Sequence, residues 1–272
     1  MNRIDKTLAR LKQSNKKMLS PYITAGDPTL LTTLATMHAL VAGGASLLEL
    51  GIPFSDPMAE GPVIQAAMER ALQQGVNCDD VFKVVAQFRE RDHDTPIILM
   101  GYLNPVEIYG YERFAARAEE VGVDGTILVD LPPEESKDVM ASWKAHGLYN
   151  IFLCSPTTSP ARMALINQYA RGYLYYVSLK GVTGSHDVDL HEVKSKYQQR
   201  KLQTNLPLMV GFGIKTPAMA ASIAEFADGV IVGAALISKL YETSCADGNI
   251  VQQATSFIAN MRQAMDNLLE KK

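Results

Sequence analysis

Cysteine, histidine and positive charge are all sparse in this sequence, and each shortage narrows the possible functions. The three cysteines, Cys78, Cys154 and Cys245, lie far apart and form no CxxC pair. An odd, scattered set argues against a disulfide framework, so we expect three reduced thiols. The five histidines form no HxxxH or HxH pair, and a dedicated metal site therefore lacks its usual paired ligands.

Charge and hydropathy exclude two further classes of partner. Lysine and arginine number 26 against 29 acidic residues, which gives a net charge of −3 and no electrostatic attraction for nucleic acid or an anionic membrane. The first 17 residues lack the uninterrupted apolar core of a signal peptide. No apolar run approaches the roughly 20 residues of a membrane span. We therefore expect a cytoplasmic chain.

Eight short apolar runs alternate along the chain with helical segments. The runs are SPYITA (20–25), SLLELG (46–51), PIILMGY (96–102), GTILVD (125–130), NIFLCS (150–155), YLYYVS (173–178), LPLMVGF (206–212) and DGVIVGA (228–234). Most are apolar nearly throughout, which is typical of strands buried on both faces of a parallel sheet.

Helical signals fill the gaps between these runs. Helices are expected at 2–13, 62–74, 79–92, 106–120, 134–146, 159–170, 235–243 and 248–268. Asp27-Pro28 and Thr216-Pro217 each offer an N-cap and a proline at the first position of a further helix. Eight strands, each followed by a helix, predict a single (β/α)₈ TIM-barrel domain over 1–272, with an N-terminal helix and an extra helix after the second strand. A doubly wound open sheet is the alternative, but the sequence has no dinucleotide-binding fingerprint.

A carboxylate interrupts the second apolar run. In a TIM barrel the active site lies at the carboxyl ends of the strands, where Glu49 falls. Between Leu48 and Leu50 its charged form is poorly solvated, so its pKa should rise toward neutrality. Such a group can both give and take a proton near pH 7. A structural carboxylate paired with a buried donor remains the alternative from these residues alone.

Glycine-rich loops follow the sixth, seventh and eighth strands. They are KGVTGSHD with Gly181 and Gly184, GFGIKTP with Gly211 and Gly213, and VGAAL with Gly233. Exposed backbone N–H groups at helix N-termini in these loops form the usual phosphate site of a barrel. We therefore predict a phosphorylated substrate, and the polar loop 179–189 could act as a lid.

The stretch LLELGIPFSDPMAEGP (47–62) resembles, almost residue for residue, the signature of the tryptophan synthase α subunit family. YITAGDP (22–28), GYLNP (101–105), VDLPPEES (129–136), YYVSLKGVTG (175–184) and GFGIKTP (211–217) fall in the order expected of that family. The resemblance covers essentially the whole chain. It implies a lyase that cleaves indole-3-glycerol phosphate by retro-aldol chemistry to indole and glyceraldehyde 3-phosphate, with no cofactor or metal for this half-reaction.

The resemblance also implies roles for individual residues. Glu49 matches the family's main acid/base, and Glu60 falls at a second carboxylate that contacts the indole N–H. Tyr175 matches a tyrosine that lines the site, and Tyr22 one that packs on the indole ring. Thr183 lies in the closing loop and would order the neighbourhood of Glu60.

The phosphate cup implied by the resemblance comprises Gly184, Gly213 and Gly233, followed by Ala234. Two positions depart from the family pattern. Most members carry Asp where this chain has Glu60, so loop 53–60 or a different rotamer must absorb one methylene. A serine is common where this chain has Ala234, so we expect the cup to depend more on backbone N–H groups. We expect retained activity with altered positioning.

The family works with a PLP-dependent β subunit in an α2β2 heterotetramer, and PLP is expected only in that partner. Residues matching positions at the contact are Ser55, Asp56, Pro57, Asn104 and Pro132. Two other hypotheses remain: a stand-alone indole-releasing lyase, and a non-catalytic subunit that activates a β subunit. A phosphosugar isomerase of the same fold would not explain the 47–62 signature.

Overall fold

The strands form one curled sheet. The computed structural model describes residues 1–178, 190–211 and 213–269. Within them the strands are β1 (Met18–Thr24), β2 (Leu48–Gly51), β3 (Ile97–Gly101), β4 (Gly125–Leu128), β5 (Tyr149–Asn150), β6 (Leu153–Cys154), β7 (Leu174–Val177), β8 (Leu208–Gly211) and β9 (Gly229–Val232). All neighbours are parallel, in the order β5-β4-β3-β2-β1-β9-β8-β7-β6.

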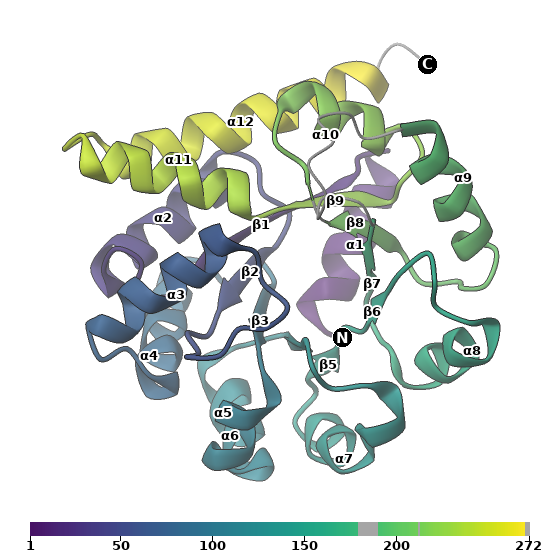
Figure 1. Cartoon of the computed structure of the whole chain (residues 1–272), viewed down its shortest axis with the longest axis horizontal. Coiled ribbons are helices and arrows are strands. Elements are labelled where there is room, and N and C mark those ends of the chain that lie inside the picture. Colours follow the sequence, from purple (N-terminus) through teal and green to yellow (C-terminus); the bar gives the residue numbers. More distant parts are fainter. Residues whose placement is uncertain (179–189, 212, 270–272) are drawn as a thin grey trace.

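The two strands at the ends of this order, β5 and β6, close the sheet into a barrel. They are consecutive in the chain and are separated only by Ile151 and Phe152. The Ile151 N–H donates to the Thr126 carbonyl on β4, and the Tyr175 N–H on β7 donates to the Phe152 carbonyl. The fifth strand, expected as one run over 150–155, is therefore present in two short pieces, and it joins both edges of a (β/α)₈ barrel (Figure 1).

The helices surround the barrel in Figure 1, with the N-terminal helix across one end. They are α1 (Arg3–Gln13), α2 (Leu30–Ala42), α3 (Pro62–Gln73), α4 (Cys78–Arg89), α5 (Leu103–Tyr109), α6 (Tyr111–Val121), the 3₁₀ turn η1 (Pro133–Glu135), α7 (Lys137–Ala145), α8 (Pro160–Tyr169), α9 (Leu190–Lys201), α10 (Pro217–Ala224), α11 (Ala234–Cys245) and α12 (Ile250–Leu269). The predicted extra helix after the second strand is confirmed, since α3 and α4 both precede β3. Over the described ranges, none of these helices combines the length and apolar character needed to span a bilayer.

Helix α1 covers the end of the barrel at which the strands begin. Asn2 Nδ2 donates to the Asp124 carbonyl at 2.9 Å, and Arg3 pairs with the Asp124 carboxylate at 3.1 Å, just before β4. Ile4 is completely buried and packs in the cluster inside the barrel. This end is therefore plugged, and the carboxyl ends of the strands form the open face.

Three local predictions need correction. The helix expected over 106–120 is broken into α5 and α6, because Gly110 adopts a left-handed φ of 90°. The helix expected from 134 begins as the 3₁₀ turn η1, and α7 starts at Lys137. Asp27 does not cap α2. The cap is Thr29, whose hydroxyl accepts from the Thr32 N–H at 3.1 Å, while Asp27 pairs with Arg70.

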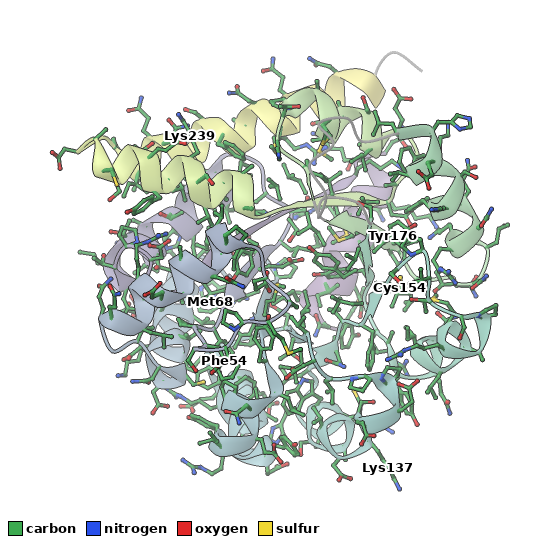
Figure 2. All side chains as sticks on the ribbon, in the orientation of Figure 1. Phe54, Met68, Lys137, Cys154, Tyr176 and Lys239 are labelled. Carbon is green, nitrogen blue, oxygen red and sulfur yellow. The ribbon has the colours of Figure 1, made fainter. Side chains whose placement is uncertain are left out.

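Side chains alternate between two cores along each strand. On β2 and the residue before it, Leu47 lies in the cluster inside the barrel, whereas Leu48 and Leu50 pack under the surrounding helices. Figure 2 shows the filled interior and, by contrast, Lys137 directed outward from α7. The alternation turns Glu49 inward, away from the helix layer.

Candidate active site

The carboxylate of Glu49 lies inside the barrel and is completely buried. Parallel pairing of β1 with β2 sets Glu49 opposite Tyr22. The Tyr173 hydroxyl on the far side of the barrel donates to Glu49 Oε1 at 2.8 Å. Glu49 Oε2 has no hydrogen-bond partner among the described residues. One oxygen is thus held in place while the other is free for a bound molecule.

The surroundings of Glu49 raise its pKa to about 7. Burial is the largest cause, because a charged carboxylate is poorly solvated there. Tyr173 and Ser20 oppose the shift, and the charge of Glu60 adds to it. The Ser20 hydroxyl is close enough to lower the pKa but meets no hydrogen-bond geometry among the described residues. The predicted upward shift is confirmed, and Glu49 can exchange a proton near neutral pH.

Glu60 reaches the same region from the loop between β2 and α3. Its side chain is partly buried, and this burial raises its pKa to about 7. Within the described part of the chain its carboxyl makes no hydrogen bond, so the backbone must fix its position. The Glu60 N–H donates to the Pro57 carbonyl at 3.0 Å, and Gln65 Nε2 donates to the Glu60 carbonyl at 2.9 Å.

Tyr102 anchors the loop that carries Glu60. Its ring stacks on Phe54 with the centroids 5.3 Å apart, and its hydroxyl accepts from the Ala59 N–H at 3.0 Å. Tyr102 follows β3 directly and is almost completely buried. The backbone on either side of Met58 is therefore tied to the barrel wall, which limits where the Glu60 carboxyl can lie.

Two tyrosines lie beside the mouth of the barrel because two glycines leave room for them. A Cβ atom on Gly51 would lie 2.1 Å from the Tyr22 hydroxyl, and one on Gly211 would lie 2.3 Å from the Tyr175 hydroxyl. Each ring thus crosses the neighbouring strand where a side chain is missing. Burial is the main cause that raises the pKa of Tyr22 and of Tyr175, and the negative charges of Glu60 and Glu49 contribute to both shifts. The two tyrosines and the two carboxyls share one region.

The described part of the glycine loops lies at adjacent strand ends, since β8 pairs with β9. Gly213 is exposed with a left-handed φ of 77°, and among the described residues no atom beyond its chain neighbours lies within 4 Å of where its Cβ would be. Gly233 precedes α11 without any side-chain cap, and Ala234 is exposed as the first residue of that helix. Thr183 and Gly184 lie outside the described residues. Backbone N–H groups at the N-terminus of α11 are available for an anion.

The residues expected to contact a partner lie on the open face. Ser55 and Asp56 are exposed in the loop after β2, and the Ser55 hydroxyl donates to the Asp56 carboxylate at 2.5 Å. Pro57 and Pro132 are partly exposed in the loops after β2 and β4, and Asn104 is exposed at the start of α5, which follows β3. Two apolar side chains nearby in the sequence are strongly exposed, Met58 in the loop after β2 at 85% and Ile108 in α5 at 79%.

An open cleft of about 590 Å³ adjoins the mouth near the ends of β4, β6 and β7. It is lined in part by Val129, Pro132, Leu153, Thr158, Arg162 and Val177. In the described ranges, no three His, Cys, Asp or Glu side chains come together as a metal site would require.

Sequence reasoning missed Tyr173 and Tyr102. Tyr173 could have been found from Tyr175, because residues two apart in a strand face the same side. Tyr102 stands in the GYLNP segment immediately after a strand, where barrel enzymes place functional residues. Both signals were therefore present in the sequence.

Comparison with known proteins agrees with this geometry. The sequence pattern of the tryptophan synthase alpha chain family matches residues 8–266. The tryptophan synthase alpha chain of Legionella pneumophila (strain Lens) is 65% identical over 268 residues, 98% of each chain. That of Xylella fastidiosa (strain M12) is 50% identical over 266 residues, 98% of this chain and 99% of that one.

Solved structures give the same result. Tryptophan synthase subunit alpha from Legionella pneumophila str. Paris superimposes with a TM-score of 0.93 at 63% identity, over 98% of this chain and 99% of that chain. A chain of tryptophan synthase from M. tuberculosis superimposes with a TM-score of 0.85 at 30% identity, over 97% and 99%. The chain therefore belongs to the tryptophan synthase alpha chain family.

Proposed function

We propose that Glu49 and Glu60 divide the proton chemistry of indole-3-glycerol phosphate cleavage at the open mouth of the barrel. Membership of its family makes the chain a carbon–carbon lyase that releases indole and glyceraldehyde 3-phosphate. One observation carries the proposal: two carboxyls at a single barrel mouth both have a pKa of about 7.

Glu49 in its acid form delivers a proton to C3 of the indole ring. The bond between C3 and the glycerol carbon then breaks, and the electron pair of that bond stays on the ring. Glu49, now ionised, takes the proton of the adjacent glycerol hydroxyl as the aldehyde forms, which regenerates the acid. Its pKa near 7 supports both steps, and the Tyr173 hydrogen bond to Oε1 leaves Oε2 for the substrate.

Glu60 in its ionised form accepts a hydrogen bond from the indole N–H. Protonation at C3 places positive charge on the indole nitrogen, and a nearby carboxylate stabilises it. Tyr22 packs on the indole ring, and Tyr175 borders the site beside Glu49. The extra methylene of Glu60 is accommodated by the loop whose Ala59 N–H is bound to Tyr102. Thr183 has an ordering role beside Glu60.

The phosphate is held by backbone N–H groups around Gly184, Gly213 and Gly233. The uncapped N-terminus of α11 supports this placement, because a helix N-terminus favours an anion. Ala234 contributes its N–H and no hydroxyl. The reaction needs neither a metal nor a cofactor held by this chain.

A β subunit covers the open face in an α2β2 assembly and holds the PLP. The contact comprises Ser55, Asp56, Pro57, Asn104 and Pro132. Support comes from Met58, in the same loop as Ser55, and from Ile108, in the same helix as Asn104, because both expose large apolar side chains. A dry passage for indole between subunits is the advantage of such an assembly.

The decisive experiment measures cleavage of indole-3-glycerol phosphate by Glu49→Gln, with and without a β subunit. We expect kcat to fall by about 10³-fold, because one side chain performs both proton transfers. Glu90→Gln, an exposed position at the end of α4, is the matched control and should leave kcat unchanged.

The Glu49→Gln variant should remain folded. The pKa of Glu49 in the folded protein exceeds its ordinary value of 4.5, so its contribution to stability is complete below about pH 4.5 and is lost as the pH rises to about 7. A neutral amide removes that loss, so the variant should unfold at no lower temperature than wild type at pH 8. Near-normal cleavage by Glu49→Gln would refute the proposed function and favour a subunit that only activates its partner. Full activity of the wild-type chain without a β subunit would favour the stand-alone lyase.

A further inference from the structure

We infer that Arg70 is a positioning residue that holds helix α3, and with it Glu60, in register with the barrel and with α11. The inference rests on the role proposed for Glu60. Arg70 itself pairs with Asp27 and Tyr241, and among the described residues no hydrogen bond or ion pair joins its side chain to those assigned to the chemistry.

Arg70 joins three elements through two strong contacts. Its Nε and Nη2 atoms lie 2.7 Å from Asp27 Oδ1 and Oδ2, a bidentate pair with the turn that follows β1. Its guanidinium carbon lies 3.9 Å from the ring centroid of Tyr241 on α11. The Asp27 side chain is only 9% exposed and that of Arg70 23%, so water screens the pair weakly. A planar guanidinium is needed for both contacts at once.

The helix that Arg70 anchors begins two residues after Glu60. Pro62 is the first residue of α3, and Gln65 Nε2 binds the Glu60 carbonyl. Arg70 follows Pro62 by eight residues, about 12 Å along the helix axis. A helix transmits a displacement of one end to the other because it is stiff over this length. Helix α3 packs on both β1 and α11, the two elements that the Arg70 contacts join to it.

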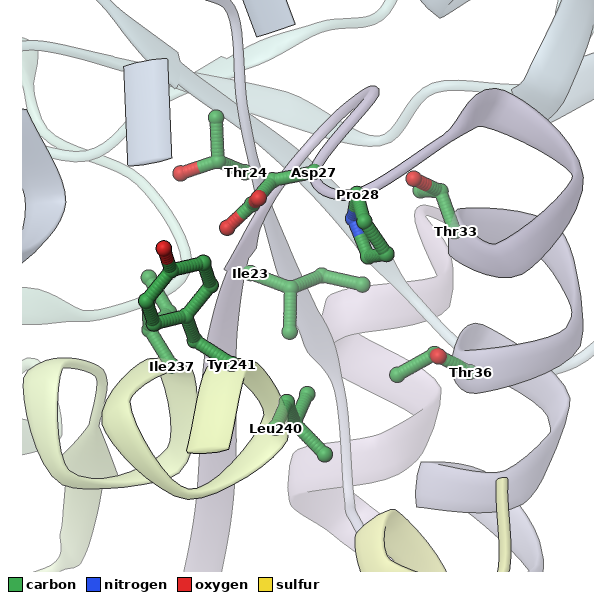
Figure 3. A pocket seen from close by; sticks show the side chains of 9 residues that line it. All are labelled: Ile23, Thr24, Asp27, Pro28, Thr33, Thr36, Ile237, Leu240 and Tyr241. Carbon is green, nitrogen blue, oxygen red and sulfur yellow. The ribbon is translucent and has the colours of Figure 1, made fainter. Parts of the chain in front are cut away.

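The turn that receives Arg70 is itself held tightly. A Cβ atom on Gly26 would lie 2.6 Å from a methyl group of Val76, which follows α3, and Gln74 Nε2 donates to the Gly26 carbonyl at 3.2 Å. Figure 3 shows the Asp27 carboxylate facing the side of the cavity where Tyr241 lies. That cavity measures only about 10 Å³, so the side chains that line it, Asp27 and Tyr241 among them, are closely packed. Arg70 therefore pairs with a tightly packed turn.

A second arginine provides the matched comparison. Arg89 pairs with Asp124 at 2.9 Å and donates to the carbonyls of Gly122 and Thr95, at the plugged end of the barrel. It is more buried than Arg70, at 9% exposure of the side chain. Loss of Arg89 should lower the free energy of unfolding at least as much as loss of Arg70. It should not displace the carboxyls at the mouth of the barrel.

The experiment compares Arg70→Met, Arg70→Lys and Arg89→Met in the complete chain with its β subunit. Circular dichroism first fixes a temperature at which all are folded. Arg70→Met should lower kcat about tenfold, because misplacement of a catalytic group by about 1 Å costs up to about 100-fold. Arg70→Lys keeps the charge but loses the bidentate fork, and should lower kcat about threefold. Inhibition by inorganic phosphate should stay within about twofold of wild type, and so should kcat of Arg89→Met.

A double-mutant cycle separates positioning from general damage. In a Glu60→Gln background the carboxylate that Arg70 places is already gone, so Arg70→Met and Arg70→Lys should each change kcat by less than about twofold. An undiminished loss in that background would overturn the inference, as would an Arg70→Met variant as active as Arg89→Met. If Arg70→Met fails to fold, Arg70→Lys replaces it in both tests. The inference is then overturned if Arg70→Lys is as active as Arg89→Met, or if its loss of kcat is undiminished in the Glu60→Gln background. Retained cleavage by Glu49→Gln refutes the proposed function instead, so the two failures are distinguishable.

Discussion

Glu49 and Glu60 reach the same pKa, about 7, in different surroundings. Glu49 is completely buried on a strand, and hydroxyl groups oppose the effect of burial. Glu60 is partly buried at the end of a loop, and burial alone shifts its pKa. The first carboxyl is positioned by a strand and by the hydrogen bond from Tyr173, whereas the second depends on how its loop and α3 are held.

This contrast explains why the chain can carry Glu rather than Asp at position 60. A strand position such as that of Glu49 has a fixed Cα and a filled neighbourhood, so one methylene would shift the carboxyl by a full bond length. A loop tied at Ala59 and Pro57 can adjust between its anchors. Exchange of Glu for Asp should therefore be tolerated better at position 60 than at position 49.

After Glu49→Gln, the largest effect within this comparison is expected from Glu60→Gln, which removes the charge and keeps the shape. Loss of a group that stabilises developing charge typically costs about 10²-fold in kcat, and we expect that loss here. Glu60→Asp should stay within about fivefold of wild type, because the charge remains and the loop adjusts. Steady-state assays of indole release measure both. Near-normal cleavage by Glu60→Gln would show that the second carboxyl has no such role.

A smaller effect is expected on the pH dependence of cleavage. Glu49 must hold a proton to protonate C3, so kcat falls as the pH rises above its pKa of about 7, whereas Glu60 must be ionised, so kcat falls as the pH drops below about 7. Tyr173→Phe removes a hydrogen bond that lowers the Glu49 pKa. In the plot of kcat against pH, the fall on the alkaline side should therefore shift to higher pH by about one unit. The fall on the acid side should stay at the same pH.

Tyr176→Phe is the matched control for this shift. Its hydroxyl is buried without a hydrogen-bond partner in the described ranges, and its ring faces the helix layer rather than the barrel interior. Its pH profile should coincide with that of wild type. If both limbs moved together in Tyr173→Phe, the assignment of the alkaline limb to Glu49 would be wrong.

The smallest effect is expected at the phosphate site. Ala234→Ser adds a hydroxyl at the exposed first residue of α11. One further hydrogen bond to phosphate should lower KM about threefold and leave kcat unchanged. Ala235→Ser, one residue further along the helix, is the control. A change in kcat without a change in KM would place the phosphate elsewhere.

The barrel and the inward-facing acid were predictable because they depend on patterns within short segments. Apolar runs marked the strands, and the residues around Glu49 predicted its raised pKa. The break of α5 from α6 was less visible, since a glycine inside a helical pattern is often tolerated. The prediction that Asp27 caps a helix was wrong because its carboxylate pairs with Arg70, which is distant in sequence. Contacts between remote segments, such as that of Ala59 with Tyr102, also carry no local signal.

The glycines beside the two mouth tyrosines have a consequence for redesign of the binding site. The Tyr22 hydroxyl occupies the place that a methyl group on Gly51 would take, so the two residues fill one volume between them. Tyr22→Phe would vacate a space about the size of one oxygen atom without altering either strand. A substituent of that size on the indole ring is the natural occupant, and an enlarged substrate range should therefore be sought at position 22 before position 51.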